Sequence, residues 1–240
     1  MGLSNREPTG ALLQPRQARA REMPSPVTAE NVLRRTVERI DGEADDRLRS
    51  LTVGESLVMV TSESGDGERA AGIAPYPGGV VPDVIGESAL EVARGGVETD
   101  ELGARAVGIA ALNTISAPVG STVSADPFHL LESGVDRVCM IGLFGPVFSQ
   151  IDSLHVDVLE RNPDEMAVPT DLPSDVEIAL HPPEAASSVI PEASVLYVTG
   201  STLVYGGLDR YRKHTSADQS VVVVGASASF DPTALFDAGV

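Results

Sequence analysis

Glycine and hydroxyl residues follow several short apolar runs, where they could bind a ligand. Gly142 and Gly145 come after residues 137–141, Gly200 lies in Thr199-Gly200-Ser201-Thr202, and Gly225-Ala226-Ser227 follows residues 220–224. Glycine lets the backbone approach a ligand closely, and the free N–H groups at a helix start can hold an anion. Each turn alone is equally consistent with a tight turn that caps itself. Together they predict a pocket for a small anionic ligand, provided that one sheet edge carries all of them.

Glu160 could select such a ligand. It ends the run 153–159 and lies 18 positions after Gly142 (160 − 142). Doubly wound dinucleotide sites place an acid at about this distance, where it accepts a hydrogen bond from a ribose hydroxyl. A solvated carboxylate in an acid-rich chain is the alternative. The spacing therefore keeps open an enzyme with an adenine-containing cofactor, either a nicotinamide nucleotide or S-adenosylmethionine.

Metal and hydrolase motifs are missing from the sequence. The single cysteine, Cys139, falls inside an apolar run and is expected in the core. Among the four histidines no pair has the spacing of H-E-x-x-H, and there is no C-x-x-C. Nor is there a G-x-S-x-G turn for a nucleophilic serine. A metal would need ligands that the fold brings together from separate segments.

The second half of the chain must position these residues. Its apolar runs are short and rich in β-branched residues, and they are separated by stretches long enough for crossover helices: 137–141, 153–159, 194–199 and 220–224, with a further strand expected at 176–180. This alternation predicts an α/β fold with a parallel sheet over residues 121–240. A short helix is expected from Asp126 to Gly134.

The first half predicts a smaller α+β domain over residues 26–120. Thr28 should cap a helix that ends near Asp41, and strands 57–60 and 70–74 should form a hairpin. A long helix should follow with Thr99 as its cap, which places Asn113 at the end of an apolar stripe. Residues 1–25 are expected to be a disordered leader, or sequence upstream of a true start at Met23.

The charge of the chain restricts its partners. The 240 residues carry 35 Asp and Glu against 17 Lys and Arg, a formal net charge of −18, with Lys213 the only lysine. Such a surface repels nucleic acids and anionic membranes. Abundant carboxylates with almost no lysine are typical of a salt-adapted, halophilic protein. Since no apolar run is long enough to cross a membrane and no secretory signal is visible, we expect a cytoplasmic protein.

Several segments together resemble a known family. They occur in the same order in both: Glu101 to Asn113, Val138 to Gly145, Val158-Leu159-Glu160, Val198 to Val204 and Leu235 to Gly239. The chain from about Thr28 onward is similar to domains named for heavy-metal chelation, long classed as a domain of unknown function. The resemblance implies an enolase N-terminal-like domain joined to a Rossmann-like domain, with the site in the cleft between them.

Carried over by motif, this resemblance implies a set of ligand-binding residues: Tyr76 and Asn113 from the first domain, and Gly142, Phe144, Gly145, Glu160, Gly200, Ser201, Thr202, Gly225 and Ser227 from the second. The leading hypothesis is a protein that binds a small anionic or metal-containing ligand, such as a heavy-metal ion, in the interdomain cleft. The alternatives are the adenine-cofactor enzyme and a non-catalytic interaction scaffold. Relatives usually continue past Val240 with another strand, so either the chain is truncated or a partner, such as a second copy, completes the sheet.

Overall fold

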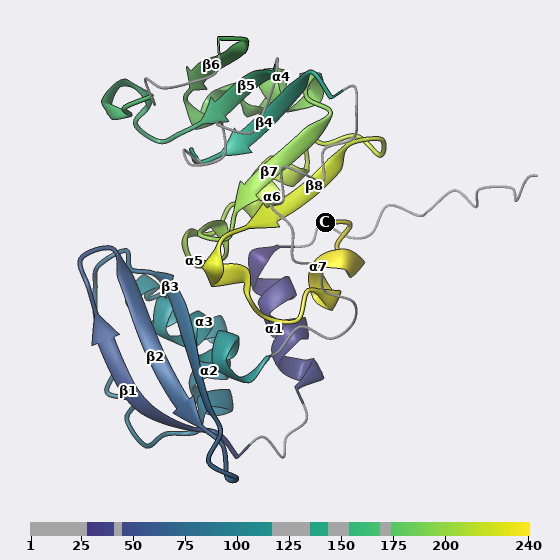
Figure 1. Ribbon diagram of the computed structural model, residues 1–240. Coiled ribbons are helices and arrows are strands. Elements are labelled where there is room, and N and C mark those ends of the chain that lie inside the picture. The colour runs from purple at the N-terminus through teal and green to yellow at the C-terminus, as the bar shows by residue number, and fades with distance from the viewer. Residues whose placement is uncertain (1–27, 41–44, 117–134, 144–153, 169–173) are drawn as a thin grey trace, which may run out of the picture.

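The computed structural model describes residues 28–40, 45–116, 135–143, 154–168 and 174–240, and these form two separate sheets with helices packed on them (Figure 1). One sheet has three antiparallel strands and the other has five parallel strands. The predicted combination of an α/β parallel-sheet domain with a smaller α+β domain is therefore confirmed. None of the helices in the described ranges is long and apolar enough to cross a membrane.

The antiparallel sheet belongs to the first domain. Its strands are β1 (Arg47–Val53), β2 (Leu57–Glu63) and β3 (Arg69–Pro75), in the order β1-β2-β3. The hairpin predicted at 57–60 and 70–74 is confirmed and is longer than expected. The strand β1 was not predicted, because two arginines interrupt its apolar pattern. The inward face is nevertheless apolar, with Val58 and Val60 fully buried.

Two helices cover the inner face of this sheet, α2 (Ala89–Glu98) and α3 (Leu102–Ile115) (Figure 1). Their backbones touch where Gly96 meets Gly108, since a Cβ atom on Gly96 would lie 2.5 Å from the Gly108 Cα. A Cβ on Gly72 of β3 would lie 2.0 Å from the carbonyl oxygen of Ala110. These glycines let α3 pack directly against both the sheet and α2.

The predicted cap of the long helix is wrong. Glu101 is the N-cap residue of α3 and makes no capping bond with its side chain. Thr99 instead ends α2, and its hydroxyl accepts a hydrogen bond from the Glu101 N–H at 3.1 Å. The helix α2 was not predicted at all, because its Gly95-Gly96 pair weakens the helical signal.

The first described helix, α1 (Ala29–Arg39), begins as predicted, with the Thr28 hydroxyl accepting from the Asn31 N–H at 3.2 Å. It packs against α2 of the first domain, and also against α5 (Thr202–Tyr205) and α7 (Thr233–Asp237) of the second. An ion pair of 2.6 Å joins Arg39 to Asp237. The helix therefore lies between the two domains (Figure 1).

The parallel sheet consists of β4 (Arg137–Ile141), β5 (Leu154–Leu159), β6 (Val176–His181), β7 (Val195–Thr199) and β8 (Ser220–Val224). Its order is β6-β5-β4-β7-β8. In chain order this reads third, second, first, fourth, fifth, as in doubly wound nucleotide-binding sheets. The strand order reverses between β4 and β7, which is where such sheets bind ligands.

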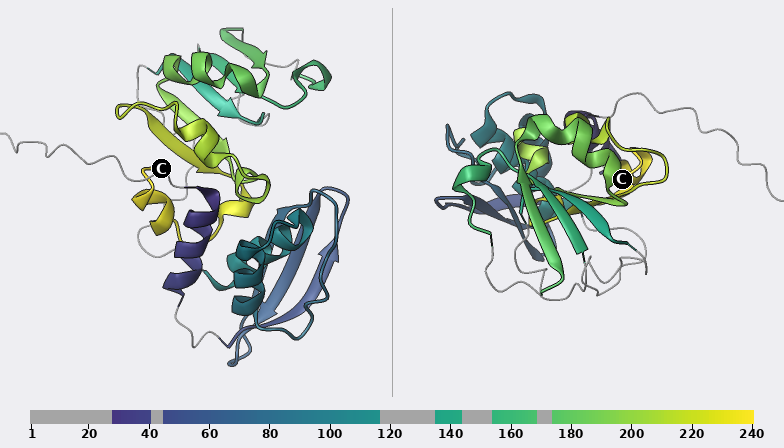
Figure 2. Two further views of the ribbon diagram at one scale, coloured as in Figure 1. Left: turned by 180° about the vertical axis from the view of Figure 1, so that it is seen from behind. Right: turned by 90° about the horizontal axis from the view of Figure 1, so that it is seen from above.

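Short helical segments connect these strands: η3 (Pro163–Glu165), η4 (Pro183–Ala185), α4 (Ala186–Val189), η5 (Ile190–Glu192), α5, α6 (Leu208–Arg212), η6 (Ala226–Ala228) and α7. The helices after β6 and β7 lie on one face of the sheet (Figure 2). On that face Cys139, Leu159 and Leu196 join the main core. The opposite face carries Val138, Val156 and Tyr197. The leader and the helix predicted at 126–134 lie outside the described residues.

Candidate functional site

The carboxyl ends of β4, β5 and β7 surround a cavity of about 280 Å³ at the switch point of the parallel sheet. Four predicted site residues line it, namely Gly142, Glu160, Ser201 and Thr202. The remaining lining residues were not predicted as site residues: Ile141, Leu159, Arg161, Thr199, Tyr205, Gly206 and Tyr211. Residues from three strand ends, from α5 and the glycine after it, and from α6 thus line one cavity.

Gly142 and Glu160 form the β4 and β5 side of the cavity. Gly142 has a φ of +83°, a conformation that favours glycine, and its N–H donates to the Leu159 carbonyl at 3.1 Å. The N–H of Glu160 donates to the His181 carbonyl at 2.9 Å, so the backbone of Glu160 continues the sheet. Its carboxylate accepts a hydrogen bond of 2.8 Å from the Arg161 N–H. The acid is thereby held at the end of the second strand.

The turn after β7 caps itself. The Thr199 hydroxyl accepts from the N–H of Ser201 at 3.3 Å and from its hydroxyl at 3.1 Å, while the Thr202 hydroxyl donates to the Thr199 carbonyl at 2.9 Å. The N–H of Gly200 donates to Val224 at 2.7 Å. The N–H groups of Gly142, Gly200 and Ser201 are thus already used inside the protein. The predicted anion-binding arrangement is therefore not present at these three positions.

Arg161 and two tyrosines form the other side of the cavity. The guanidinium carbon of Arg161 lies 4.5 Å from the centre of the Tyr205 ring, which is stacking distance. Burial raises the pKa of Tyr211, so its phenol stays neutral at physiological pH. The cavity therefore combines one carboxylate, one guanidinium, hydroxyl groups and aromatic surface. Sequence reasoning missed the aromatic part, because the tyrosines lie within two short helices, α5 and α6, and belong to no motif.

Asn113 connects the two domains. Its Nδ2 donates to the carbonyls of Ile73 at 3.0 Å, Ala226 at 3.3 Å and Ser227 at 3.3 Å. Three surrounding carbonyls require the amide nitrogen on this side, so the orientation of the amide is fixed. Its Oδ1 is buried and has no hydrogen-bond partner among the residues that the structure describes. The predicted polar residue at the end of α3 therefore lies at the domain interface.

Gly200, Gly225 and Ser227 lie beside this interface. A Cβ on Gly200 would be 2.6 Å from the Ser227 hydroxyl, and Gly225 has a φ of +112°. Because Gly200 directly precedes Ser201, the interface adjoins the cavity. Tyr76 lies elsewhere: its hydroxyl donates to Gly79 at 2.8 Å, in a loop that packs against the first turn of α3. Phe144 and Gly145 lie outside the described residues.

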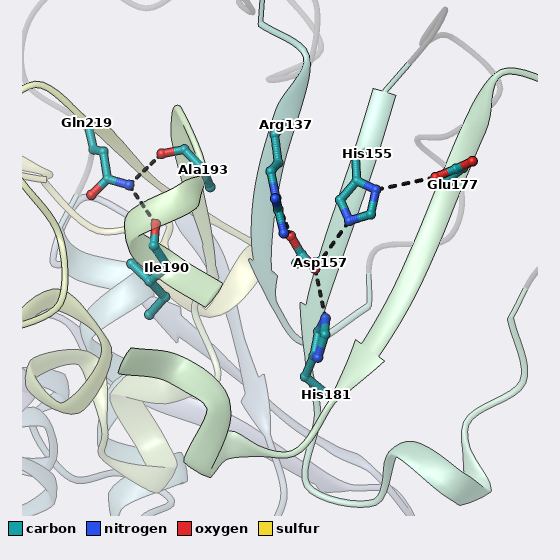
Figure 3. Close-up of polar contacts among 8 residues, drawn as sticks. All are labelled: Arg137, His155, Asp157, Glu177, His181, Ile190, Ala193 and Gln219. Atoms are coloured by element: carbon teal, nitrogen blue, oxygen red, sulfur yellow. Dashed lines mark hydrogen bonds and ion pairs between the residues drawn. The ribbon is translucent and has the colours of Figure 1, made fainter. Parts of the chain in front are cut away.

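A second polar cluster lies on the face of β4, β5 and β6, and we call it the Asp157 cluster (Figure 3). Asp157 is only 1% exposed, in the middle of the apolar strand β5. One of its carboxylate oxygens accepts from Arg137 Nε at 2.8 Å, and the other lies 2.7 Å from His181 Nε2 and 3.4 Å from His155 Nε2. His155 Nδ1 lies 3.5 Å from Glu177. The cluster ties three adjacent strands together.

Electrostatics in this cluster favours the ionised carboxylate. Burial alone would raise the pKa of Asp157, but the hydrogen bonds from Arg137 and His181 outweigh burial and lower it. Only one feature of the sequence indicates this cluster, namely Asp157, a charged residue inside an apolar strand. Its partners are 20 and 24 positions away and could not be identified from spacing.

The donor atoms of the described residues do not fit a heavy-metal ion. Such ions favour thiolate and imidazole ligands. The cavity offers one carboxylate and hydroxyl groups, while burial raises the pKa of the Cys139 thiol to about 12 and keeps it protonated. Both histidines of the Asp157 cluster face its carboxylate. In the described part of the chain, no group of three or more His, Cys, Asp or Glu residues is placed to hold a metal.

Solved structures match the chain along most of its length. A protein of unknown function from the DUF364 family of Pyrococcus horikoshii is 21% identical, with a TM-score of 0.65, covering 86% of this chain and 82% of the other. A DUF364 protein of unknown function from Desulfitobacterium hafniense DCB-2 is 17% identical, with a TM-score of 0.63, covering 88% and 83%. At these identities the likeness concerns the fold. No curated protein matches the chain.

Two family comparisons cover both domains. Residues 34–116 match DUF4213 and residues 126–240 match DUF364, and both families are described as "Putative heavy-metal chelation". The DUF4213 match contains the antiparallel sheet, and the DUF364 match contains the parallel sheet. The chain therefore joins a domain of the DUF4213 family to a domain of the DUF364 family, both of which carry this description.

Proposed function

We propose that this protein binds a small, hydroxyl-bearing polar ligand in the cavity at the carboxyl ends of β4, β5 and β7. Glu160 would accept a hydrogen bond from a ligand hydroxyl, and Ser201 would contribute a second polar contact. The observation that carries the proposal is that Gly142, Glu160, Ser201 and Thr202, from three strand ends, line one cavity at the switch point. Open parallel sheets bind their ligands at this place.

The chemistry of the lining favours a polar organic ligand over a free metal ion or a phosphate. Glu160 and Arg161 together carry no net charge, and the N–H groups of Gly142, Gly200 and Ser201 already have acceptors. In the lining that the structure describes, a multiply charged anion could thus pair with only one cationic side chain, Arg161, which is itself stacked on Tyr205. The described residues that line the cavity all belong to the second domain, and Gly200 connects it to the interface at Asn113.

Thermal unfolding in molar salt tests the proposal. The untagged protein is heated with ribose, inorganic phosphate, cadmium chloride or adenosine, each at a series of concentrations. A ligand at about 100 times its Kd should stabilise the fold by about 2.7 kcal/mol, which raises the Tm by roughly 5–10 °C for a chain of this size. We expect this rise with a hydroxyl-bearing ligand.

A pair of variants locates the site. Glu160→Gln should reduce the stabilisation by the hydroxyl-bearing ligand, whereas Glu177→Gln should leave it unchanged, because Glu177 is an exposed carboxylate at the opposite end of the same sheet. Stabilisation by cadmium alone, unaffected by Glu160→Gln, would contradict the proposal in favour of metal chelation. No stabilisation by any of the compounds would favour an interaction scaffold.

A further inference from the structure

The cavity has two chemically different halves that lie next to each other. Glu160 and the hydroxyl residues occupy the strand ends, while Tyr205 and Tyr211 supply aromatic surface from the segments after β7. Arg161 joins the halves, because it directly follows Glu160 and stacks on Tyr205 at 4.5 Å. A ligand that fills the cavity must therefore present hydroxyl groups on one side and a flat ring on the other.

The stacked Arg161–Tyr205 pair suits a nucleobase. Guanidinium planes and aromatic side chains are the two kinds of protein group on which bases stack. Arg161 is exposed, Tyr205 is partly buried and both line the cavity, so the pair is accessible to a ligand. Because Glu160 lines the same cavity, a ribose on its carboxylate would carry a base toward this pair.

The size of the cavity and its backbone donors limit the ligand further. A volume of about 280 Å³ lies just below the roughly 300–1,000 Å³ of typical small-molecule pockets, which favours a ligand the size of one nucleoside over a dinucleotide. Phosphate binding at a switch point normally uses free N–H groups. Here those of Gly142, Gly200 and Ser201 already donate to Leu159, Val224 and Thr199. The lining therefore lacks the expected phosphate cradle at these positions.

We infer that the ligand of this cavity is a nucleoside, with its ribose hydroxyls on Glu160 and its base stacked on the Arg161–Tyr205 pair. This inference rests on the proposed function and names the ligand class. Among the adenine-containing ligands considered above, it favours one whose binding does not depend on a phosphate group.

Tyrosine fluorescence provides a direct test, because the chain contains no tryptophan and only four tyrosines. Two of these line the cavity. Adenosine, guanosine, cytidine and uridine are titrated into the full chain in molar salt, with ribose and AMP as comparisons, and calorimetry gives the Kd independently. We expect at least one nucleoside to quench the fluorescence and to bind at least tenfold more tightly than ribose.

Variants distinguish stacking from other contacts. Tyr205→Leu should weaken nucleoside binding by roughly 5- to 100-fold, the range measured for loss of one base-stacking side chain, whereas Tyr205→Phe should stay close to the parent. Arg161→Lys keeps the charge but loses the plane and should also weaken binding. Tyr76→Phe, in the first domain, is the matched control and should not change the Kd. Circular dichroism checks that each variant folds.

The outcomes separate this inference from the proposed function. If ribose binds as tightly as every nucleoside and Tyr205→Leu has no effect, the nucleoside inference fails while the role of Glu160 stands. If AMP binds more than tenfold more tightly than adenosine, the ligand is a nucleotide and the inference also fails. If neither ribose nor any nucleoside binds, both proposals fall.

Discussion

At the scale of single residues, Asp157 shows how an ionised side chain is accommodated within a parallel sheet. An isolated buried carboxylate would be strongly unfavourable, but Arg137 and His181 donate to its two oxygens. Both partners remain partly exposed, at 35% and 28%, so water also reaches the cluster. The three side chains come from three strands, and their contacts fix how β4, β5 and β6 lie relative to one another.

This arrangement predicts a defined pH dependence of stability. The pKa of Asp157 is lower in the folded protein than in the unfolded chain. Its contribution to the free energy of unfolding is therefore fully present above the pKa of the unfolded chain, about 3.9. This contribution is lost as the pH falls through the lower pKa of the folded protein. Asp157→Asn should lower the free energy of unfolding by about 2 kcal/mol at pH 7, the loss of a charged hydrogen bond.

Urea unfolding of the parent and the variant, measured from pH 7 downward, checks this prediction. The difference between them should shrink below about pH 4. Glu177→Gln is the control, because that carboxylate is 83% exposed and its contact with His155 is at the surface. A difference that stays constant down to pH 2 would show that Asp157 is not the titrating group.

At the scale of elements, glycines determine how closely α3 packs. Gly96 and Gly108 bring α2 and α3 into backbone contact, and Gly72 does the same for β3 and α3. Small residues at a helix contact allow the axes to approach, and any added side chain must push them apart. The position of Asn113 at the end of α3, and with it the domain interface, depends on this packing.

Neighbouring glycines in α2 allow a matched comparison. Gly96→Ala should lower the free energy of unfolding by about 1–3 kcal/mol, because the new Cβ would overlap the Gly108 backbone. Gly95→Ala should instead raise it by about 0.5–1 kcal/mol, since Gly95 is exposed, nothing lies within 4 Å of its added Cβ, and alanine favours the helix. Thermal and urea unfolding measure both. Equal effects of the two substitutions would contradict the packing argument.

At the scale of the whole molecule, the charge of −18 governs behaviour in salt. Like charges on a compact surface repel each other, and salt screens that repulsion. We expect the Tm to rise between millimolar and molar potassium chloride, by about 2–4 °C for each kcal/mol of repulsion that is relieved. Sucrose at matched osmolarity is the control for general stabilisation. An unchanged Tm and circular dichroism spectrum would count against salt adaptation.

The sequence predicted what depends on neighbouring residues. The Thr28 cap lies three residues from its partner, and the β-branched runs of the parallel strands can be identified from consecutive residues. Features that depend on distant partners were not predictable. Asn113 was identified as a polar residue at the end of an apolar stripe, but its acceptors lie 40 and more than 100 positions away. The aromatic half of the cavity and the Asp157 cluster were missed for the same reason.

The contact between α1 and α7 has a consequence for synthesis on the ribosome. Translation reaches α7 about 190 residues after α1, which takes roughly 10–40 s at 5–20 residues per second. Until then α1 can pack against α2 and, once residues 202–205 have been made, against α5, but the partner of Arg39 is still missing. The first domain can form early, but the contact of α1 with α7 must wait until residues 233–237 have emerged.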